Sequence, residues 1–171
     1  VPRDPAFYLD TNTDFAALGL PETIGRRASK SRHAPIILPD RFVFVPFQVP
    51  SDMQITLHSP WVRDMAQFLS LIRDAADRNP AETFVIKEHP SFRASVAPLF
   101  APHPRVIFAN GNPTDDLIAR SRAVITINST VGIEALQAAK PVITLGTACY
   151  NIERLVLQAR DAASLDAALA R

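Results

Sequence analysis

The chain has 171 residues, of which 47% are hydrophobic, and its formal net charge is +1. This length fits one domain with a sizeable core. The near-neutral charge excludes a global field that would steer the protein towards nucleic acid or an anionic membrane. Cys149 is the single cysteine, which excludes an internal disulfide framework and a cysteine-rich metal site and predicts a reducing compartment. No apolar run in the sequence is long enough to span a bilayer.

The N-terminal part shows no clear hydrophobic period. Residues 5–20 are compatible with a short helix, and residues 25–35 have the composition of a mobile basic linker. Since the chain begins at Val1 rather than Met, we interpret it as a fragment or a trimmed form. We interpret residues 1–40 as a linker or the remnant of an N-terminal domain. A regular pattern follows, so the second predicted domain spans residues 41–171.

Apolar, β-rich runs alternate with helical patterns through this second domain. The predicted strands are 41–49, 83–88, 105–109, 122–128, 140–146 and 155–159. The predicted helices are 59–79, 91–100, 113–121, 129–139 and 161–171. The expected helix caps are Ser59 followed by Pro60, then Thr114, then Ser129 or Asn128, and finally Asp161 or Ser164. The strands are apolar without alternation, as in a parallel sheet that is buried on both faces.

Strands that alternate with helices predict an α/β fold, here a Rossmann-like doubly wound parallel sheet of about six strands. The common strand order is 3-2-1-4-5-6, which places the ligand crevice between strands one and four, outside their carboxyl ends. Polar clusters follow strands one, two and four. They therefore meet at one edge of the sheet, and this edge is the predicted binding site.

The cluster after strand four reads NSTVGIE. Asn128, Ser129 and Thr130 stand where a strand passes into a helix, whose free backbone N–H groups and dipole attract an anion such as phosphate. Gly132 permits the close approach of a ligand or a neighbouring helix. Glu134 can accept hydrogen bonds from both hydroxyls of a ribose. The alternatives are that Ser129 only caps the helix and that Glu134 only complements the dipole.

The cluster KEHP ends strand two. His89 can donate to a phosphate and contact a pyrimidine nucleotide, and Pro90 fixes the turn that holds the ring. Lys87 is either a cation whose stem lies along apolar surface or a counter-charge for the ligand. A lone histidine is more often a surface residue or one that is satisfied internally. Its position on the shared edge favours a ligand role.

The cluster QVPSDMQI follows strand one and contains Gln48, Asp52 and Gln54. Two amides and a carboxylate can bind the hydroxyls of a sugar or the edge of a base. The alternative is a polar loop in which Asp52 makes a turn. The other histidines of the chain lack the spacing of metal ligands, so we predict no metal site. The sequence contains no dinucleotide-binding fingerprint, no Walker loop and no hydrolase nucleophile elbow.

The segments PFQVPSDMQITLHSPW, VIKEHP and VITINSTVGIEALQAAKPVITLG, with the ACY that follows, resemble the capsular polysaccharide biosynthesis and export family. This family includes the β-Kdo transferases that build the lipid-linked Kdo linker of bacterial capsules. The resemblance runs from about Arg41 to about Leu157. The His-Pro pair is also similar to that of bacterial sialyltransferases of GT-B type, where it contacts the CMP of the donor.

The resemblance implies the nucleotide-binding half of a GT-B glycosyltransferase that takes Kdo from CMP-Kdo without a cofactor or a metal. It implies that His89 and Pro90 hold the cytidine nucleotide, that Ser129 and Thr130 hold its phosphate and that Glu134 binds ribose. The full nucleotide set comprises Lys87, His89, Pro90, Asn128, Ser129, Thr130, Gly132 and Glu134, and the sugar or cleft set comprises Gln48, Asp52 and Gln54. Asp52 is the one catalytic candidate, since the family's catalytic carboxylate is expected in an N-terminal domain.

The resemblance further implies a lipid-linked saccharide acceptor, capsule assembly and export proteins as partners, and no nucleic acid. It implies a cytoplasmic location that includes the periphery of the inner membrane. Three alternatives stay open. They are a teichoic-acid-type polyol-phosphate transferase with a CDP-activated donor, a non-catalytic nucleotide-binding domain of a capsule assembly protein, and a nucleotide-sugar epimerase of the same architecture. The turn INSTVGIEAL, in place of an Asp-Tyr-Ser-Ser pattern, favours the capsule family over the first.

Overall fold

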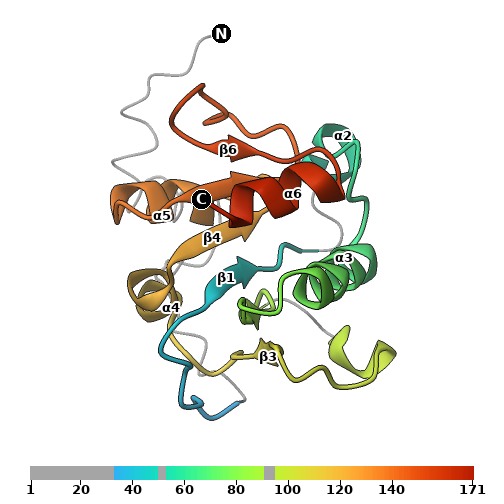
Figure 1. Cartoon of the computed structure of the whole chain (residues 1–171), viewed down its shortest axis with the longest axis vertical. Coiled ribbons are helices and arrows are strands. Elements are labelled where there is room, and N and C mark those ends of the chain that lie inside the picture. Colours follow the sequence, from blue (N-terminus) through green and yellow to red (C-terminus); the bar gives the residue numbers. More distant parts are fainter. Residues whose placement is uncertain (1–32, 50–52, 91–94) are drawn as a thin grey trace, which may run out of the picture. The chain divides into compact units, whose positions relative to one another are not determined.

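The computed structural model describes residues 33–49, 53–90 and 95–171 (Figure 1). They belong to a compact unit that spans residues 31–171. This unit is built on a six-stranded sheet with the order β3-β2-β1-β4-β5-β6, and all neighbouring strands are parallel. The predicted order is confirmed, and the chain changes direction between β1 and β4.

The elements are short and follow the predicted alternation. The strands are β1 (Val43–Pro46), β2 (Phe84–Lys87), β3 (Val106–Phe108), β4 (Ala123–Thr126), β5 (Val142–Thr144) and β6 (Leu157–Gln158). The helices are α2 (Met53–His58), α3 (Met65–Arg78), α4 (Thr114–Arg120), α5 (Val131–Gln137) and α6 (Ala162–Leu169), with one 3-10 turn, η2 (Ala97–Leu99). In register, Val43 of β1 pairs with Phe84 of β2 on one side and with Ala123 of β4 on the other.

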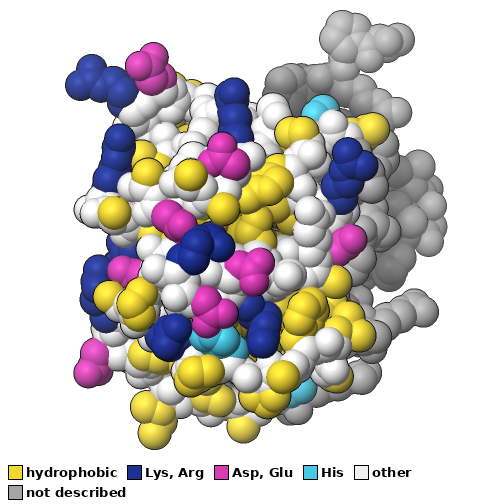
Figure 2. Space-filling model, turned by 45° about the vertical axis from the view of Figure 1, so that its right-hand side comes forward, with side chains coloured by type: hydrophobic (Ala, Val, Ile, Leu, Met, Phe, Trp, Pro, Cys, Tyr) yellow, Lys and Arg dark blue, Asp and Glu magenta, His cyan; other side chains and the backbone are white. Residues whose placement is uncertain are grey.

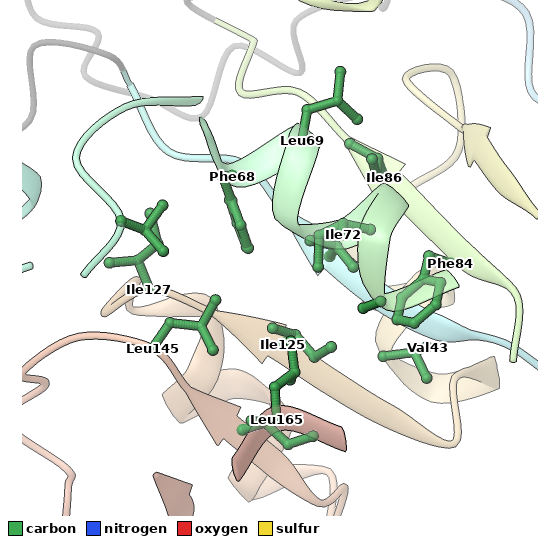
Figure 3. Close-up of a cluster of buried hydrophobic side chains, with 14 of the residues drawn as sticks. Val43, Phe68, Leu69, Ile72, Phe84, Ile86, Ile125, Ile127, Leu145 and Leu165 are labelled. Carbon is green, nitrogen blue, oxygen red and sulfur yellow. The ribbon is translucent and has the colours of Figure 1, made fainter. Parts of the chain in front are cut away.

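Helices α3 and α6 cover one face of the sheet (Figure 3). Phe68, Leu69 and Ile72 of α3 are at most 1% exposed, and their spacing of three and four residues places them on one side of the helix. Leu165 brings α6 into the same cluster. Burying each of these side chains stabilises the fold by about 1.5–3 kcal/mol before entropy is counted.

Helices α4 and α5 cover the opposite face. Successive strand residues point to opposite faces, so Phe44 of β1 and Val124 of β4 belong to this second cluster. Leu117 of α4 and Ala135 of α5 pack against them, and all four side chains are fully buried. Both faces of the sheet are therefore buried, which explains why its strands read as continuous apolar runs.

The predicted start of the long helix is wrong. Helix α3 begins at Met65, and its N-cap is Asp64, whose carboxylate accepts a hydrogen bond from the Gln67 N–H at 2.7 Å. Ser59 instead donates its hydroxyl proton to the Val62 carbonyl. Ser59 therefore stabilises a turn before the helix. Residues 53–58, to which the sequence patterns assigned no helix, form α2.

Two further caps lie one or two residues from their predicted positions. Helix α4 has Pro113 at its cap and begins at Thr114, which was the predicted cap. Helix α5 has Thr130 at its cap rather than Ser129 or Asn128. Neither cap residue makes a side-chain capping hydrogen bond with the described residues. At the start of α5 the hydroxyl of Ser129, one of the two predicted caps, accepts a hydrogen bond from the Val131 N–H instead.

The predicted cap of the final helix is confirmed. Asp161 accepts a hydrogen bond from the Ser164 N–H at 2.7 Å, and the Ser164 hydroxyl accepts one from the Asp161 N–H at 3.1 Å. In the predicted helix at 91–100, only Ala97–Leu99 is helical among the described residues. Residues 91–94 and the predicted helix at 5–20 lie outside the described part of the chain.

Residues 33–40, predicted to be linker, lie against the compact unit. The Ile36 N–H donates to the Asn112 side-chain oxygen, and the Asn112 amide donates back to the Ile36 carbonyl, both at 3.0 Å. Leu38 is 4% exposed and belongs to the cluster beneath α4 and α5. The unit thus begins before the predicted domain boundary at Arg41. Across the described ranges, every helix is too short or too polar to cross a bilayer.

The core beneath α3 gives a direct stability prediction. Ile72 is fully buried, so Ile72→Ala should lower the free energy of unfolding by about 2–5 kcal/mol. Asp74→Ala on the exposed side of the same helix should change it by less than about 0.5 kcal/mol. Urea denaturation measures both. Equal effects of the two substitutions would contradict the packing described here.

Candidate functional site

The carboxyl ends of β1, β2 and β4 carry polar residues at one edge of the sheet, as predicted. We call this edge the carboxyl rim, defined by Gln48, residues 87–90 and residues 128–134. Because β1 lies between β2 and β4, the ends of those two strands are about 10 Å apart. Asp52 lies outside the described residues. The backbone of Gln54 lies in α2, and its side chain is outside the described part.

Gln48 and Asn128 join the ends of β1 and β4 through their amides. The Gln48 Nε2 donates to Asn128 Oδ1 at 2.9 Å, and the Asn128 backbone N–H donates to Gln48 Oε1 at 3.2 Å. The two residues are 4% and 7% exposed. The Gln48 amide, predicted to face a sugar or the cleft, is thus engaged within the protein. The pair holds the switch point of the sheet together.

The start of α5 differs from the row of free N–H groups that was predicted. The Val131 N–H donates to the Ser129 hydroxyl at 3.2 Å, and the Gly132 N–H donates to the Ser129 carbonyl at 3.0 Å. These two groups are therefore satisfied internally, and that part of the prediction is wrong. The groups that face solvent are the side chains of Thr130 and Glu134, both of which are exposed.

Gly132 allows the ring of Tyr150 to approach the first turn of α5. A Cβ at this position would lie 2.3 Å from the Tyr150 hydroxyl oxygen and 2.6 Å from Cζ. The Tyr150 hydroxyl donates to the Ser129 carbonyl. Burial raises the pKa of Tyr150, so the phenol keeps its proton. The glycine is thus explained by a tyrosine of this chain, a residue to which the sequence patterns gave no role.

Lys87 anchors the end of β2 to the loop after β3. Its ammonium donates to the carbonyl of Asn112 and, at 3.3 Å, to that of Asn110. Burial lowers the pKa of Lys87, and the negative charge of Asp115 opposes that shift. The structure therefore gives this cation internal acceptors, and its predicted role as a counter-charge for a ligand stays a prediction.

Glu88 belongs to the KEHP cluster, but the sequence patterns gave it no role of its own. It is 7% exposed, and its carboxylate accepts hydrogen bonds at 2.8 Å from the Ser95 hydroxyl, the Val96 N–H and the Asn110 amide. Its own N–H donates to Asn110 Oδ1 at 2.9 Å. One buried carboxylate thus fixes the point at which the exposed His89 leaves the sheet. The sequence signal that could have indicated this role is the position of an acidic residue directly after a buried strand.

The chemistry that this rim offers is hydrogen bonding and modest charge. The exposed groups are the imidazole of His89, the hydroxyl of Thr130 and the carboxylate of Glu134. Beneath them lie the buried amides of Gln48 and Asn128. The described residues contain no group of three or more His, Cys, Asp or Glu that could hold a metal ion. Basic and acidic side chains are interspersed on the face shown in Figure 2. The fold and the rim together define a Rossmann-like domain with a polar switch-point site.

A family model described as capsule polysaccharide biosynthesis protein matches residues 22–168. The chain therefore belongs to the capsule polysaccharide biosynthesis protein family, as its motifs predicted. It is 58% identical over 170 residues to protein FixF of Sinorhizobium fredii, covering 99% of this chain and 42% of that protein. It is 33% identical over 132 residues to the capsule polysaccharide export protein KpsS of Escherichia coli, covering 71% and 34%. The chain spans less than half the length of these relatives.

The fold is that of one half of a larger solved protein. The β-Kdo 2,7 transferase KpsC of Thermosulfurimonas dismutans superimposes with a TM-score of 0.59 at 24% sequence identity, covering 78% of this chain and 46% of that one. This similarity confirms the predicted fold class, the Rossmann-like half of a GT-B architecture.

The contact between Gly132 and Tyr150 predicts a coupled pair of substitutions. Gly132→Ala should lower the free energy of unfolding by about 1–3 kcal/mol, because the new methyl group overlaps the ring. In a Tyr150→Leu background the overlap is removed, and the same change should become neutral or stabilise by up to about 1 kcal/mol through helix propensity. Urea denaturation of the four proteins measures the coupling. An equal cost in both backgrounds would contradict this explanation of the glycine.

Proposed function

We propose that this chain is the donor-binding half of a glycosyltransferase of capsule polysaccharide biosynthesis. Its proposed donor is CMP-Kdo, and its proposed acceptor is a lipid-linked saccharide. Family membership supports a role in capsule biosynthesis, and the resemblance of the KEHP and NSTVGIE motifs supports a cytidine-activated donor. The observation that carries the proposal is the rim itself, where exposed polar groups from two strand ends flank the switch point of the sheet.

The rim suggests how a nucleoside monophosphate would lie. His89 leaves β2 on one side of β1, and Thr130 begins α5 on the other. A nucleotide that bridges this span would place its cytosine near Pro90 and His89 and its phosphate near Thr130, within reach of the His89 ring, while the ribose that joins base and phosphate faces Glu134. The buried pair of Gln48 and Asn128 would form the floor beneath it, which gives these amides a supporting role.

The proposed chemistry follows from the leaving group. Transfer breaks the bond between the anomeric carbon of the sugar and a phosphate oxygen, and CMP departs with the electron pair. An acceptor hydroxyl oxygen forms the new bond and gives its proton to a base. The charge that develops on the CMP phosphate would be stabilised by the His89 ring and the Thr130 hydroxyl, which needs no metal. Asp52 stays the one catalytic candidate in this chain.

Calorimetric titration of the chain with CMP, UMP and CDP tests the donor. We expect CMP to bind most tightly. His89→Ala should weaken CMP binding by about 10- to 100-fold, since a hydrogen bond to a charged group contributes about 1.5–3 kcal/mol. His103→Ala is the matched control, because His103 precedes β3 at the opposite edge of the sheet, where its ring bonds Asp77 at 3.0 Å. It should leave CMP binding unchanged.

Three outcomes would contradict the proposal. Preference for UMP would indicate a UDP-sugar enzyme, such as an epimerase of the same architecture. Preference for CDP would indicate a polyol-phosphate transferase. Binding of none of the three, or binding that His89→Ala and His103→Ala affect alike, would indicate a non-catalytic domain or a different site.

A further inference from the structure

The turn between β4 and α5 makes several hydrogen bonds within its own segment. The Ser129 N–H donates to the Thr126 hydroxyl at 3.2 Å, and the Ser129 hydroxyl accepts from the Val131 N–H at 3.2 Å. The Ser129 carbonyl accepts from the Gly132 N–H at 3.0 Å. These partners all belong to β4 or to the first turn of α5. Such local bonds shape the turn, but they do not fix it against the rest of the domain.

Tyr150 supplies a bond to the same turn from a distant segment. It lies in the loop after β5, 21 residues further along the chain, and its hydroxyl donates to the Ser129 carbonyl directly before Thr130. Tyr150 is 7% exposed and belongs to the cluster beneath α4 and α5. Because burial raises the pKa of Tyr150, the phenol stays a donor. The turn is thus held from outside by a side chain that is itself buried.

The loop that carries Tyr150 is braced against its surroundings. The Thr147 N–H donates to the carbonyl of His58, the last residue of α2, at 2.8 Å. The Asn151 amide donates to the Gly146 carbonyl at 2.9 Å, which closes the loop just after β5. The position of the phenol is therefore set by α2 and by the end of β5, and its hydrogen bond passes that position on to the turn.

The hydroxyl of Tyr150, rather than its ring alone, makes this connection. Gly132 gives the ring its space, since a Cβ at that position would overlap it. A glycine within a helix is less stable than an alanine, so the sequence gives up helix stability where the phenol reaches Ser129. A phenylalanine would fill the same space without making the bond.

We propose that Tyr150 is a positioning residue for the phosphate of the bound nucleotide. Its hydroxyl fixes the Ser129 carbonyl and thereby the exposed Thr130, whose hydroxyl meets the phosphate. A donor that is already in place binds more tightly, because less has to be ordered when the ligand arrives. The inference rests on the proposed function and extends it by a residue outside the carboxyl rim. Since Tyr150 acts through this turn alone, it affects recognition of the phosphate and not of the base.

Tyr150→Phe removes the hydroxyl and keeps the ring, and titration with CMP and with cytidine separates the phosphate from the rest of the ligand. Tyr150→Phe should weaken CMP binding about three- to tenfold. It should leave cytidine binding, followed by the amide chemical shifts of the labelled chain, unchanged. Gly132→Ala displaces the ring from the other side and should also weaken the binding of CMP but not of cytidine. It tests the inference even where Tyr150→Phe fails to fold.

A double-substitution cycle tests whether Tyr150 acts through Thr130. Thr130→Val alone should weaken CMP binding, because the hydroxyl at the phosphate is lost. Adding Tyr150→Phe to Thr130→Val should cause little further loss, since the group to be positioned is gone.

Ser121→Ala is the matched control for the loss of a buried hydroxyl. Ser121 is 2% exposed, and its hydroxyl donates to the Ile118 carbonyl at 2.9 Å. It lies between α4 and the start of β4, at the opposite edge of the sheet from the carboxyl rim. Ser121→Ala removes the same kind of bond as Tyr150→Phe. It should lower the melting temperature and leave CMP binding unchanged.

The outcomes distinguish this inference from the proposed function. If Tyr150→Phe weakens CMP and cytidine binding alike, the tyrosine has a structural role only and the inference is overturned. Additive losses in the cycle, or normal CMP binding by Thr130→Val, also overturn it. His89-dependent CMP binding that Tyr150→Phe leaves unchanged contradicts the inference alone. Absence of CMP binding by the unsubstituted chain contradicts the proposed function and the inference with it.

Discussion

The amide pair between Gln48 and Asn128 joins the two strands at which the chain changes direction, and the rest of the site depends on it. The residues are 80 positions apart in sequence, and both are buried at the end of an apolar sheet. A buried amide without its partner is costly, so each side chain fixes the other. This pairing sets where β1 ends and where the turn into α5 begins.

Around that pair, the rim separates residues that build the site from residues that face solvent. Glu88 and Lys87 fix the end of β2, while His89 remains exposed beyond them. Tyr150 and the Ser129 hydroxyl satisfy the start of α5, while Thr130 remains exposed. The proposed nucleotide would therefore meet a small set of side chains held in place by buried hydrogen bonds. Such preorganisation favours binding because little is left to order when the ligand arrives.

The sheet could be predicted because its signal is local. Apolar runs without alternation, separated by helical patterns, imply a parallel sheet, and the common strand order then places the three polar clusters together. The residues that cap the helices were harder to predict from the sequence. Ser59 and Asp64 both precede a helical pattern, and which one caps α3 is decided by a turn that Ser59 makes with Val62. The predicted free N–H groups of α5 failed for a related reason, since Ser129 satisfies two of them within its own turn.

The partners of Glu88 and Gly132 could not be read from the sequence, because each lies on a distant segment. Asn110 comes from the loop after β3, and Tyr150 comes from the loop after β5. The sequence patterns predicted that Gly132 permits the close approach of a ligand or a neighbouring helix, whereas its neighbour is the side chain of Tyr150. They placed Glu88 in the KEHP cluster and predicted no partner for it. A glycine at a helix start suggests ligand approach as readily as side-chain approach, and only the fold distinguishes the two.

We propose that the ligand of this domain is a cytidine nucleotide held at the carboxyl rim. The most direct test is a titration of the isotopically labelled chain with CMP, followed by backbone amide chemical shifts. We expect the shifted amides to cluster at Glu88, His89 and residues 128–134, on both sides of β1. Shifts confined to the opposite edge of the sheet, or no shifts at saturating CMP, would contradict it.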